Sequence, residues 1–388
     1  MIPIAKPYLD QRESDAVGRV IATGWITQGP EIAAFEREFA ECVGAEFACA
    51  VSNCTTGLHL ALLAAGVGPG DEVITVSHSF IATSNCIRYC GATPVFVDIS
   101  PETYNIRPEA IMEAITPATR AIICVHQMGM PCDLAKVLVV ARRYGIPLIE
   151  DAACAIGSQI FWNGKWESIG SPHGDAACFS FHPRKILTTG DGGMITTRHR
   201  QWDEQFRLMR QHGMSVPDTV RHGSSRVIFE KYPELGYNYR MTDIQGAIGR
   251  EQLKRLPVLI ARRRQLAERY AELLEGLEGV SVPQEPEWAR SNWQSYCCRL
   301  EEWISQVDVM QALLDRGIAS RRGIMCAHKE GAYGDLQWRS ESLLEESVKA
   351  QEQCLLLPLF HQLSDADQIF IAAELRDIVS RHSTAKVA

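Results

Sequence analysis

The chain has 388 residues, of which 46% are hydrophobic and 22% are charged, so it is long enough for two folded units with sizeable cores. Its formal net charge of −8 argues against broad binding to nucleic acid or to anionic membranes. The start of the chain lacks the apolar run of a signal peptide, and no stretch approaches the roughly 20 apolar residues that span a bilayer. We therefore expect a cytoplasmic protein with neither nucleic-acid nor membrane partners.

The first half of the chain alternates short β-rich runs with helix-like segments. The predicted strands are 48–52, 71–76, 93–98, 121–125 and 147–151, and the predicted helices between them include 57–66, 81–90 and 132–145. The strands are apolar throughout rather than alternating, which indicates burial on both faces. Strand and helix in turn predict an α/β fold, in which a mostly parallel sheet is flanked by helices. Ligands of such sheets bind beyond the carboxyl ends of the strands.

Beyond residue 240 the pattern changes to longer amphipathic helices. The predicted helices are 241–256, 258–277, 307–317 and 364–382, with a strand at 297–303. We therefore predict two domains. Residues 1–245 would form an N-terminal arm and a large domain, and residues 246–388 a smaller α+β C-terminal domain.

The thirteen cysteines are scattered through predicted strands and helices, and none has the CxxC spacing of a zinc site. Cys42, Cys90 and Cys178 are typical of small apolar core residues. This usage favours reduced thiols in a cytoplasmic compartment and predicts no metal site.

A strand that ends in a Ser/Asn/Thr turn precedes the helix in SNCTTGLHLALL (52–63). The free amides of a helix N-terminus and the hydroxyls of Thr55 and Thr56 suit a phosphate group. The same residues also cap helices without any ligand, and this alternative stays open. The stretch is neither a Walker loop nor a GxGxxG motif, which argues against nucleoside triphosphates and dinucleotides.

Two charged residues follow predicted strands. Asp151 ends the run LIED, where a buried carboxylate needs a cationic partner. It would be either a helix N-cap or the counter-ion of a protonated ring nitrogen. Lys185 lies in FSFHPRKILTTGDGG (179–193), between an apolar strand and a glycine-rich turn. A lysine in an apolar site has a lowered pKa and can form a Schiff base, whereas the alternative is a surface lysine. With Ser180 and the phosphate-ready turn, these are the parts of a pyridoxal phosphate site.

The chain resembles the DegT/StrS family of sugar aminotransferases, which are fold-type-I pyridoxal phosphate enzymes, over nearly its whole length. The matching stretches are ATGWITQGPEIAAFEREFA (22–40), SNCTTGLHLAL (52–62), GATPVFVDISPETYNI (91–106), LIEDAACAIGS (148–158), FSFHPRKILTTGDGGMITT (179–197), LGYNYRMTDIQGAIGREQLKRL (235–256) and LLLPLF (355–360). They occur in the family's order and spacing, and together they are highly specific.

The resemblance implies a role for each matching residue. Lys185 would be the Schiff-base lysine, Asp151 the partner of the pyridinium nitrogen and Phe80 the aromatic ring stacked on the cofactor. Thr55, Thr56 and Ser180 would hold the cofactor phosphate. Asn238 resembles a residue that reaches the phosphate from the neighbouring subunit, which implies a homodimer with shared active sites.

The sequence departs from the family pattern at two cysteines. Cys54 stands where the family usually has Gly or Ala, and a small thiol should preserve the turn. Cys154 stands where Gln or His commonly lies near the cofactor's ring hydroxyl. Because a thiol is a weak donor, either Cys154 tunes the cofactor differently or another group, such as His126, replaces it.

The implied activity is transamination of a nucleotide-linked keto-sugar, with L-glutamate as the amino donor and no metal. Trp25, Ile26 and Thr27 resemble the loop that closes over the sugar. A basic segment would bind the diphosphate or, alternatively, is only a solvated loop; its residues are Arg321, Arg322, His328 and Lys329.

Two other functions are compatible with the same fold. A pyridoxal phosphate sugar dehydratase would carry His in place of the lysine, whereas this chain has Lys185, and His182 lies three residues earlier. A non-catalytic regulator would have lost the lysine or the aspartate, and both are present. The sequence therefore favours the aminotransferase.

Overall fold

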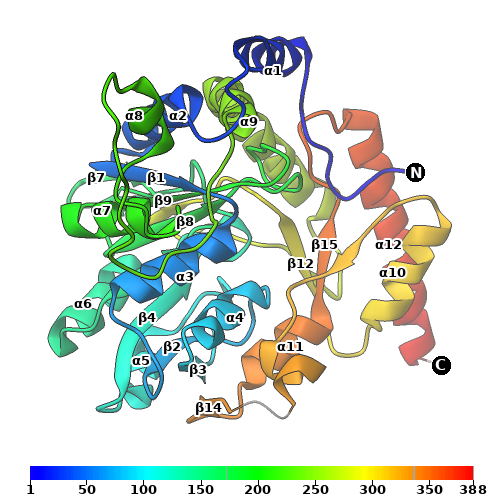
Figure 1. The fold of residues 1–388 in the computed structure, drawn as a ribbon. Helices are drawn as coiled ribbons and strands as arrows, with labels where there is room; N and C mark the ends of the chain where they lie inside the picture. Colours follow the sequence, from blue (N-terminus) through cyan, green and yellow to red (C-terminus); the bar gives the residue numbers. More distant parts are fainter. Residues whose placement is uncertain (172, 335–336, 388) are drawn as a thin grey trace.

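The computed structural model describes residues 1–171, 173–334 and 337–387, and its main feature is an eight-stranded sheet (Figure 1). The strands in spatial order are β1 (Phe47–Val51), β9 (Gly193–Thr197), β8 (Ala176–Ser180), β5 (Leu148–Asp151), β4 (Thr119–Val125), β2 (Glu72–Val76), β3 (Thr93–Val97) and β14 (Arg339–Ser340). Among these strands only β9 is antiparallel to its neighbours. The predicted α/β fold with a mostly parallel sheet is confirmed.

Helices cover both faces of this sheet, which explains why its strands are apolar throughout. Successive residues of β1 alternate between two hydrophobic clusters, since Ala48 and Ala50 belong to one and Cys49 and Val51 to the other. The second cluster draws on α3 (Cys54–Ala64), α4 (Ala82–Tyr89) and α7 (Arg200–Met209). The first draws on α2 (Pro30–Val43), α5 (Pro108–Ala114), α6 (Leu134–Tyr144) and the start of α9 (Asp243–Leu274).

A separate hydrophobic cluster lies in the C-terminal part, with members from Leu266 to Val379. Its strands are β10 (Val280–Ser281), β12 (Tyr296–Leu300), β15 (Cys354–Leu357) and β13 (Arg321–Arg322), in that order in a four-stranded sheet. Its helices are α10 (Gln306–Asp315), α11 (Glu345–Gln353) and α12 (Asp365–Val387). The predicted strand at 297–303 is thus found close to its expected place.

Helix α9 corrects the prediction of two helices at 241–256 and 258–277. It is one helix of 32 residues with Pro257 inside it, and a capping box between Thr242 and Gln245 begins it. A proline removes one backbone bond and disfavours a helix interior, but burial can outweigh that cost. Here Leu256 packs in the core of the large sheet and Leu266 in the C-terminal cluster, so the helix is buried on both sides of the proline.

Several short segments connect the two halves of the chain. β11 (Ala289–Arg290) pairs with β6 (Gln159–Trp162), which also pairs with β7 (Lys165–Ser168). At the N-terminus, Ile2 forms a bridge with Ile318. The remaining elements are α1 (Gln11–Thr23), α8 (Asp218–Gly223) and the 3-10 helices Gln127–Gly129, Ala327–Lys329 and Gly331–Tyr333.

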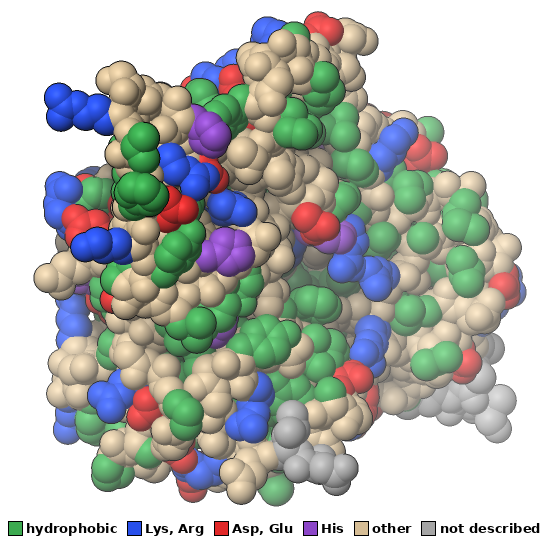
Figure 2. Space-filling view, viewed as in Figure 1, with side chains coloured by type: hydrophobic (Ala, Val, Ile, Leu, Met, Phe, Trp, Pro, Cys, Tyr) green, Lys and Arg blue, Asp and Glu red, His purple; other side chains and the backbone are tan. Residues whose placement is uncertain are grey.

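All thirteen thiols are free, but Cys42 is exposed on α2 rather than in the core as predicted, because it lies on the solvent side of the helix next to buried Val43. Figure 2 shows basic and acidic side chains interspersed on the visible face. Among the described residues, no helix combines the length and the apolar character needed to cross a membrane.

Candidate active site

Asp151 is the last residue of β5 and lies at the carboxyl edge of the sheet, where only 5% of its surface is exposed. Thr83 Oγ1 donates to Asp151 Oδ2 at 2.7 Å, and the amide of Ala153 donates to Oδ1 at 3.2 Å. The carboxylate is therefore held in one orientation by donors on its inner side. A buried carboxylate needs a cationic partner, and a protonated ring nitrogen would provide one.

Lys185 follows β8, the strand adjacent to β5, so the sheet order brings it to the same edge as Asp151. Its Nζ lies 2.9 Å from Cys154 Sγ. Burial alone would lower the pKa of Lys185, but the interactions with Cys154, Cys54 and Asp151 outweigh burial and raise it. The pKa shift of Lys185 is therefore opposite to the lowering expected for a lysine in an apolar site, because Cys154, Cys54 and Asp151 interact with the amine.

The phosphate cradle predicted from sequence lies at the start of α3. Asn53 caps this helix by accepting from Thr56 N, and Thr56 Oγ1 donates to Asn53 O at 2.7 Å, so Thr56 serves the cap. Thr55 is half-buried in the same first turn. Ser180 lies at the same level of the sheet, because both it and Val51 pair with Gly193.

Gly193 allows the close approach of β9 to this turn. A Cβ at this position would lie 2.6 Å from the carbonyl carbon of Asn53, so a larger residue would push the helix start away. Ser180 and the first turn of α3 thus lie at the same edge of the sheet. Together with Asp151 and Lys185 they supply a carboxylate, an amine and phosphate donors, which is the donor set that pyridoxal phosphate needs.

Two other predicted cofactor contacts border this edge. Phe80 follows β2 and leaves 63% of its side chain exposed, which gives it a free aromatic face. Asn238 is exposed, and the adjacent Tyr239 carbonyl accepts from Ser52 N, so this segment runs along the end of β1.

His126 does not replace Cys154. It is fully buried, its Nε2 lies 3.0 Å from Glu150 Oε2, and its Nδ1 accepts from Cys132 N at 2.9 Å. Since Nδ1 accepts a backbone proton, the ring proton is on Nε2 and is donated to Glu150. Both ring nitrogens are therefore engaged inside the sheet, and Cys154 is the group that contacts the lysine.

The predicted sugar loop is anchored from the start of α9. Asp243 N donates to the Thr27 carbonyl at 3.1 Å, and the Asp243 carboxylate accepts from Gly29 N at 2.7 Å. Trp25 Nε1 donates to the Gln28 carbonyl, while the side chain of Ile26 is 52% exposed. The loop is thus fixed at its base and exposed at its tip.

The basic segment of the C-terminal part reaches the same region in two places. His328 Nδ1 lies 2.6 Å from Ser77 Oγ, just after β2 and close in sequence to Phe80. The pKa of Arg184, which precedes the lysine, is lowered. Partial burial is the larger cause, and the nearby positive charge of Arg321 is the second. The other two residues are engaged elsewhere, since Arg322 pairs with Glu330 and Lys329 pairs with Glu352.

Three residues at this site were not predicted from the sequence. Thr83, which orients Asp151, lies three residues after Phe80, and its place shortly after a predicted strand is a signal that could have pointed to it. Asn292 and Gln294 lie in a loop of the C-terminal part and hydrogen-bond to the backbone around Cys154 and Lys185. No local pattern marks them, because their partners are more than a hundred positions away.

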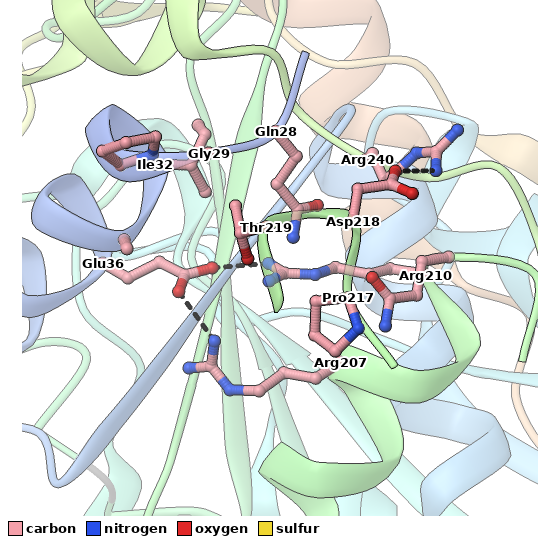
Figure 3. A pocket seen from close by; sticks show the side chains of 13 residues that line it. Gln28, Gly29, Ile32, Glu36, Arg207, Arg210, Pro217, Asp218, Thr219 and Arg240 are labelled. Carbon is pink, nitrogen blue, oxygen red and sulfur yellow. Dashed lines mark hydrogen bonds and ion pairs between the residues drawn. The ribbon is translucent and has the colours of Figure 1, made fainter. Parts of the chain in front are cut away.

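A cavity of about 360 Å³ lies between α2, the base of the sugar loop at Gln28 and Gly29, and the residues from the end of α7 to Thr219. Figure 3 shows Glu36 between Arg207 and Arg210, with Arg240 paired to Asp218 at the rim. Asp151, Lys185 and the first turn of α3 are not among its lining residues, so this cavity is distinct from the predicted cofactor site.

The mostly parallel sheet and the groups at its carboxyl edge define a fold-type-I pyridoxal phosphate transferase. The chain belongs to the DegT/DnrJ/EryC1/StrS aminotransferase family, whose model matches residues 7–376. This membership confirms the predicted class, a sugar aminotransferase that depends on pyridoxal phosphate.

Three relatives illustrate the similarity. The chain is 36% identical to the spore coat polysaccharide biosynthesis protein SpsC of Bacillus subtilis, over 97% of both chains. Its structure matches the aminotransferase TlmJ from Streptoalloteichus hindustanus with a TM-score of 0.90 and 35% identity, covering 99% of this chain and all of that one. It also matches the PMP-form of the putative sugar aminotransferase Spr1654 from Streptococcus pneumoniae, with a TM-score of 0.92 and 27% identity over 98% of this chain and 100% of that one.

Proposed function

We propose that the protein transfers the amino group of L-glutamate to a keto-sugar linked to a nucleoside diphosphate, with Lys185 as the Schiff-base lysine. The observation that carries this proposal is the convergence of Lys185 and Asp151. They are far apart in the sequence, yet adjacent strands bring both to one edge of the sheet. Covalent pyridoxal phosphate chemistry requires an amine for the aldehyde and a carboxylate for the ring nitrogen.

The residues of this edge divide the work of holding the cofactor. Asp151 would keep the ring nitrogen protonated, Phe80 would cover the ring, and the first turn of α3 with Ser180 would bind the phosphate. Cys154 would lie near the ring through its contact with the lysine amine. The bound cofactor supplies an electron sink for the carbon that loses its proton.

Lys185 would move that proton. Its Nζ would take the proton from Cα of the amino donor as a base and would release it again as an acid. Because the pKa of Lys185 is raised, the amine must give up a proton before it can act as a base. The same amine would perform these steps in reverse when the keto-sugar binds.

The acceptor would lie between the sugar loop and the basic segment. Trp25 and Thr27 would face the sugar, while Arg321 and His328 would face the diphosphate, for which arginine provides bidentate contacts. Arg322 would join them by exchanging its pair with Glu330 for the diphosphate. The printed names of SpsC and Spr1654, which refer to polysaccharide biosynthesis and a sugar aminotransferase, support this class of acceptor.

We further propose a homodimer in which Asn238 of each subunit serves the other subunit's site. The segment before Asn238 supports this, since it exposes large apolar side chains that a second copy could bury. These side chains are Val220, Val227, Phe229, Tyr232 and Leu235. We assign the reaction to the cytoplasm, since thirteen unpaired thiols fit a reducing compartment.

An absorbance experiment tests the proposal. The protein with pyridoxal phosphate should show a yellow band that bleaches on addition of L-glutamate, and Lys185→Ala should show neither. Keto-sugar nucleotides should then restore the band, and mass spectrometry should find the amino-sugar. A wild-type band that is indifferent to glutamate, with loss of water from the sugar, would establish the dehydratase instead.

A further inference from the structure

The turn Asn292–Trp293–Gln294 touches the backbone on both sides of the lysine. Gln294 Nε2 donates to the carbonyl of Arg184 at 2.7 Å, and its Oε1 accepts from the amide of Ile186 at 3.1 Å. One side chain thus binds the peptide groups immediately before and after Lys185. Two such bonds restrict the direction in which the lysine side chain leaves the backbone.

Asn292 holds the thiol partner in the same way. Its Nδ2 donates to the carbonyls of Cys154 and Ile156, both at 2.8 Å, and its amide donates to Ser158 Oγ at 3.0 Å. The side chain of Asn292 is fully buried, and only 9% of Gln294 is exposed. One short turn therefore holds the segments that carry both the amine and the sulfur of the 2.9 Å contact.

The turn itself is rigidly built. Asn292 Oδ1 accepts from Gln294 N at 2.8 Å, and buried Arg263 of α9 donates to the carbonyls of Trp293 and Gln294. Trp293 has a φ of 54°, a left-handed conformation that a non-glycine residue adopts only when its surroundings impose it. A side chain at Gly129 would meet Asn292 Oδ1, so that position leaves room for the turn.

We propose that Gln294 is a positioning residue for the amine of Lys185, with Asn292 as its counterpart for Cys154. The catalytic part of this inference rests on the proposed role of Lys185. Neither amide would touch the substrate, so both would act only through the direction of Nζ. Small errors in the placement of a reacting group cost rate rather than affinity.

Gln294→Met tests the clamp, because methionine has a similar length and cannot make either hydrogen bond. In the cofactor-free protein, hydrogen exchange at the Ile186 amide should become about tenfold faster. Gln306→Met is the matched control, since Gln306 also donates to two carbonyls, those of Gln351 and Cys354, but far from Lys185. The control should leave exchange at Ile186 unchanged, and unchanged exchange in Gln294→Met would overturn the clamp.

The catalytic part has its own measurement. In Gln294→Met we expect kcat for glutamate to fall about 10- to 100-fold, with KM within about threefold of wild type. Gln294→Glu keeps the acceptor for Ile186 but lacks the donor to Arg184 until its carboxyl is protonated, so its kcat defect relative to wild type should shrink as the pH falls. Faster exchange with unchanged kcat would overturn the positioning role. If wild type fails to respond to glutamate, the proposed function fails, while the exchange experiment still decides the clamp.

Discussion

Glu36 on α2 is a buried carboxylate shared by two arginines, and its replacement by glutamine gives a quantitative prediction. Arg207 and Arg210 both pair with it (Figure 3). Glu36 Oε1 also accepts from Ala50 N at 2.9 Å. The two arginines donate in turn to backbone carbonyls of β1. The network thus fixes the strand that leads directly into the first turn of α3.

Glu36→Gln keeps the shape of the side chain and an oxygen that can accept from Ala50 N, but it removes the negative charge. Arg210 is then buried without its counter-ion. Breaking a buried ion pair from one side costs about 3–5 kcal/mol. With roughly 2.1 cal/mol/K of unfolding entropy per residue, this chain has about 0.8 kcal/mol/K, so Tm should fall by about 4–6 °C. Glu38→Gln on the same helix removes only a half-exposed pair with Arg250 and should cost less than about 1 kcal/mol.

The pH dependence of this difference has a definite sign. Burial would raise the pKa of Glu36, but Arg210 and Arg207 outweigh burial and lower it below its ordinary value of 4.5. The stabilisation is therefore present above that value and is lost as pH falls through the lowered pKa. Thermal unfolding of both variants between neutral and acid pH measures it. The reasoning is refuted if Glu36→Gln is no less stable at neutral pH than Glu38→Gln.

Three further predictions concern the site itself. Thr83→Val removes the hydroxyl that donates to Asp151, so the free energy of unfolding measured by urea titration should fall by about 1.5–3 kcal/mol and less cofactor should be retained on dialysis. If neither value changes, the role of Thr83 is contradicted. Because the pKa of Lys185 is raised, the rate of covalent capture of pyridoxal phosphate should increase roughly tenfold per pH unit above neutrality, as measured by stopped-flow absorbance. Cys154→Ala should shift this pH–rate profile to lower pH. A flat profile would argue against a protonated Lys185 in the resting protein. Lys185→Ala and Asn238→Ala should each be inactive. Mixing equal amounts of the two variants should restore about a quarter of wild-type activity, because half the dimers are then mixed and each mixed dimer has one complete site out of two. No recovery after verified subunit exchange would count against the shared site.

The fold was largely predictable because apolar runs report burial directly. Strand ends such as Asp151 were located within a residue, and two parallel strands that share an edge were enough to bring Asp151 and Lys185 together. The continuous helix through Pro257 was not predictable, since packing in two cores decided it rather than local propensity. For the same reason a domain boundary at residue 245 stays a prediction, because α9 belongs to both cores.

The chemistry around the lysine was less predictable than its position. The direction of the Lys185 pKa shift depends on Cys154 and Asp151, and their distances follow only from the folded sheet. Asn292 and Gln294 are ordinary polar residues in the sequence. Their hydrogen bonds to the backbone around Cys154 and Lys185 form only because β11 pairs with β6 and so places the turn at the sheet edge.

Strand β14 has a consequence for how this protein is made. Arg339 and Ser340 pair with Val95 and Phe96 of β3, and Arg339 pairs with Glu72 at the start of β2. The outer edge of the large sheet is therefore closed by a segment that a ribosome adds about 240 residues after β3, roughly 10–50 s later at usual elongation rates. Throughout that interval β3 presents free amides and carbonyls to any neighbouring nascent chain. Synthesis of this enzyme thus includes a period of open-edge exposure that ends only when residue 340 has left the exit tunnel.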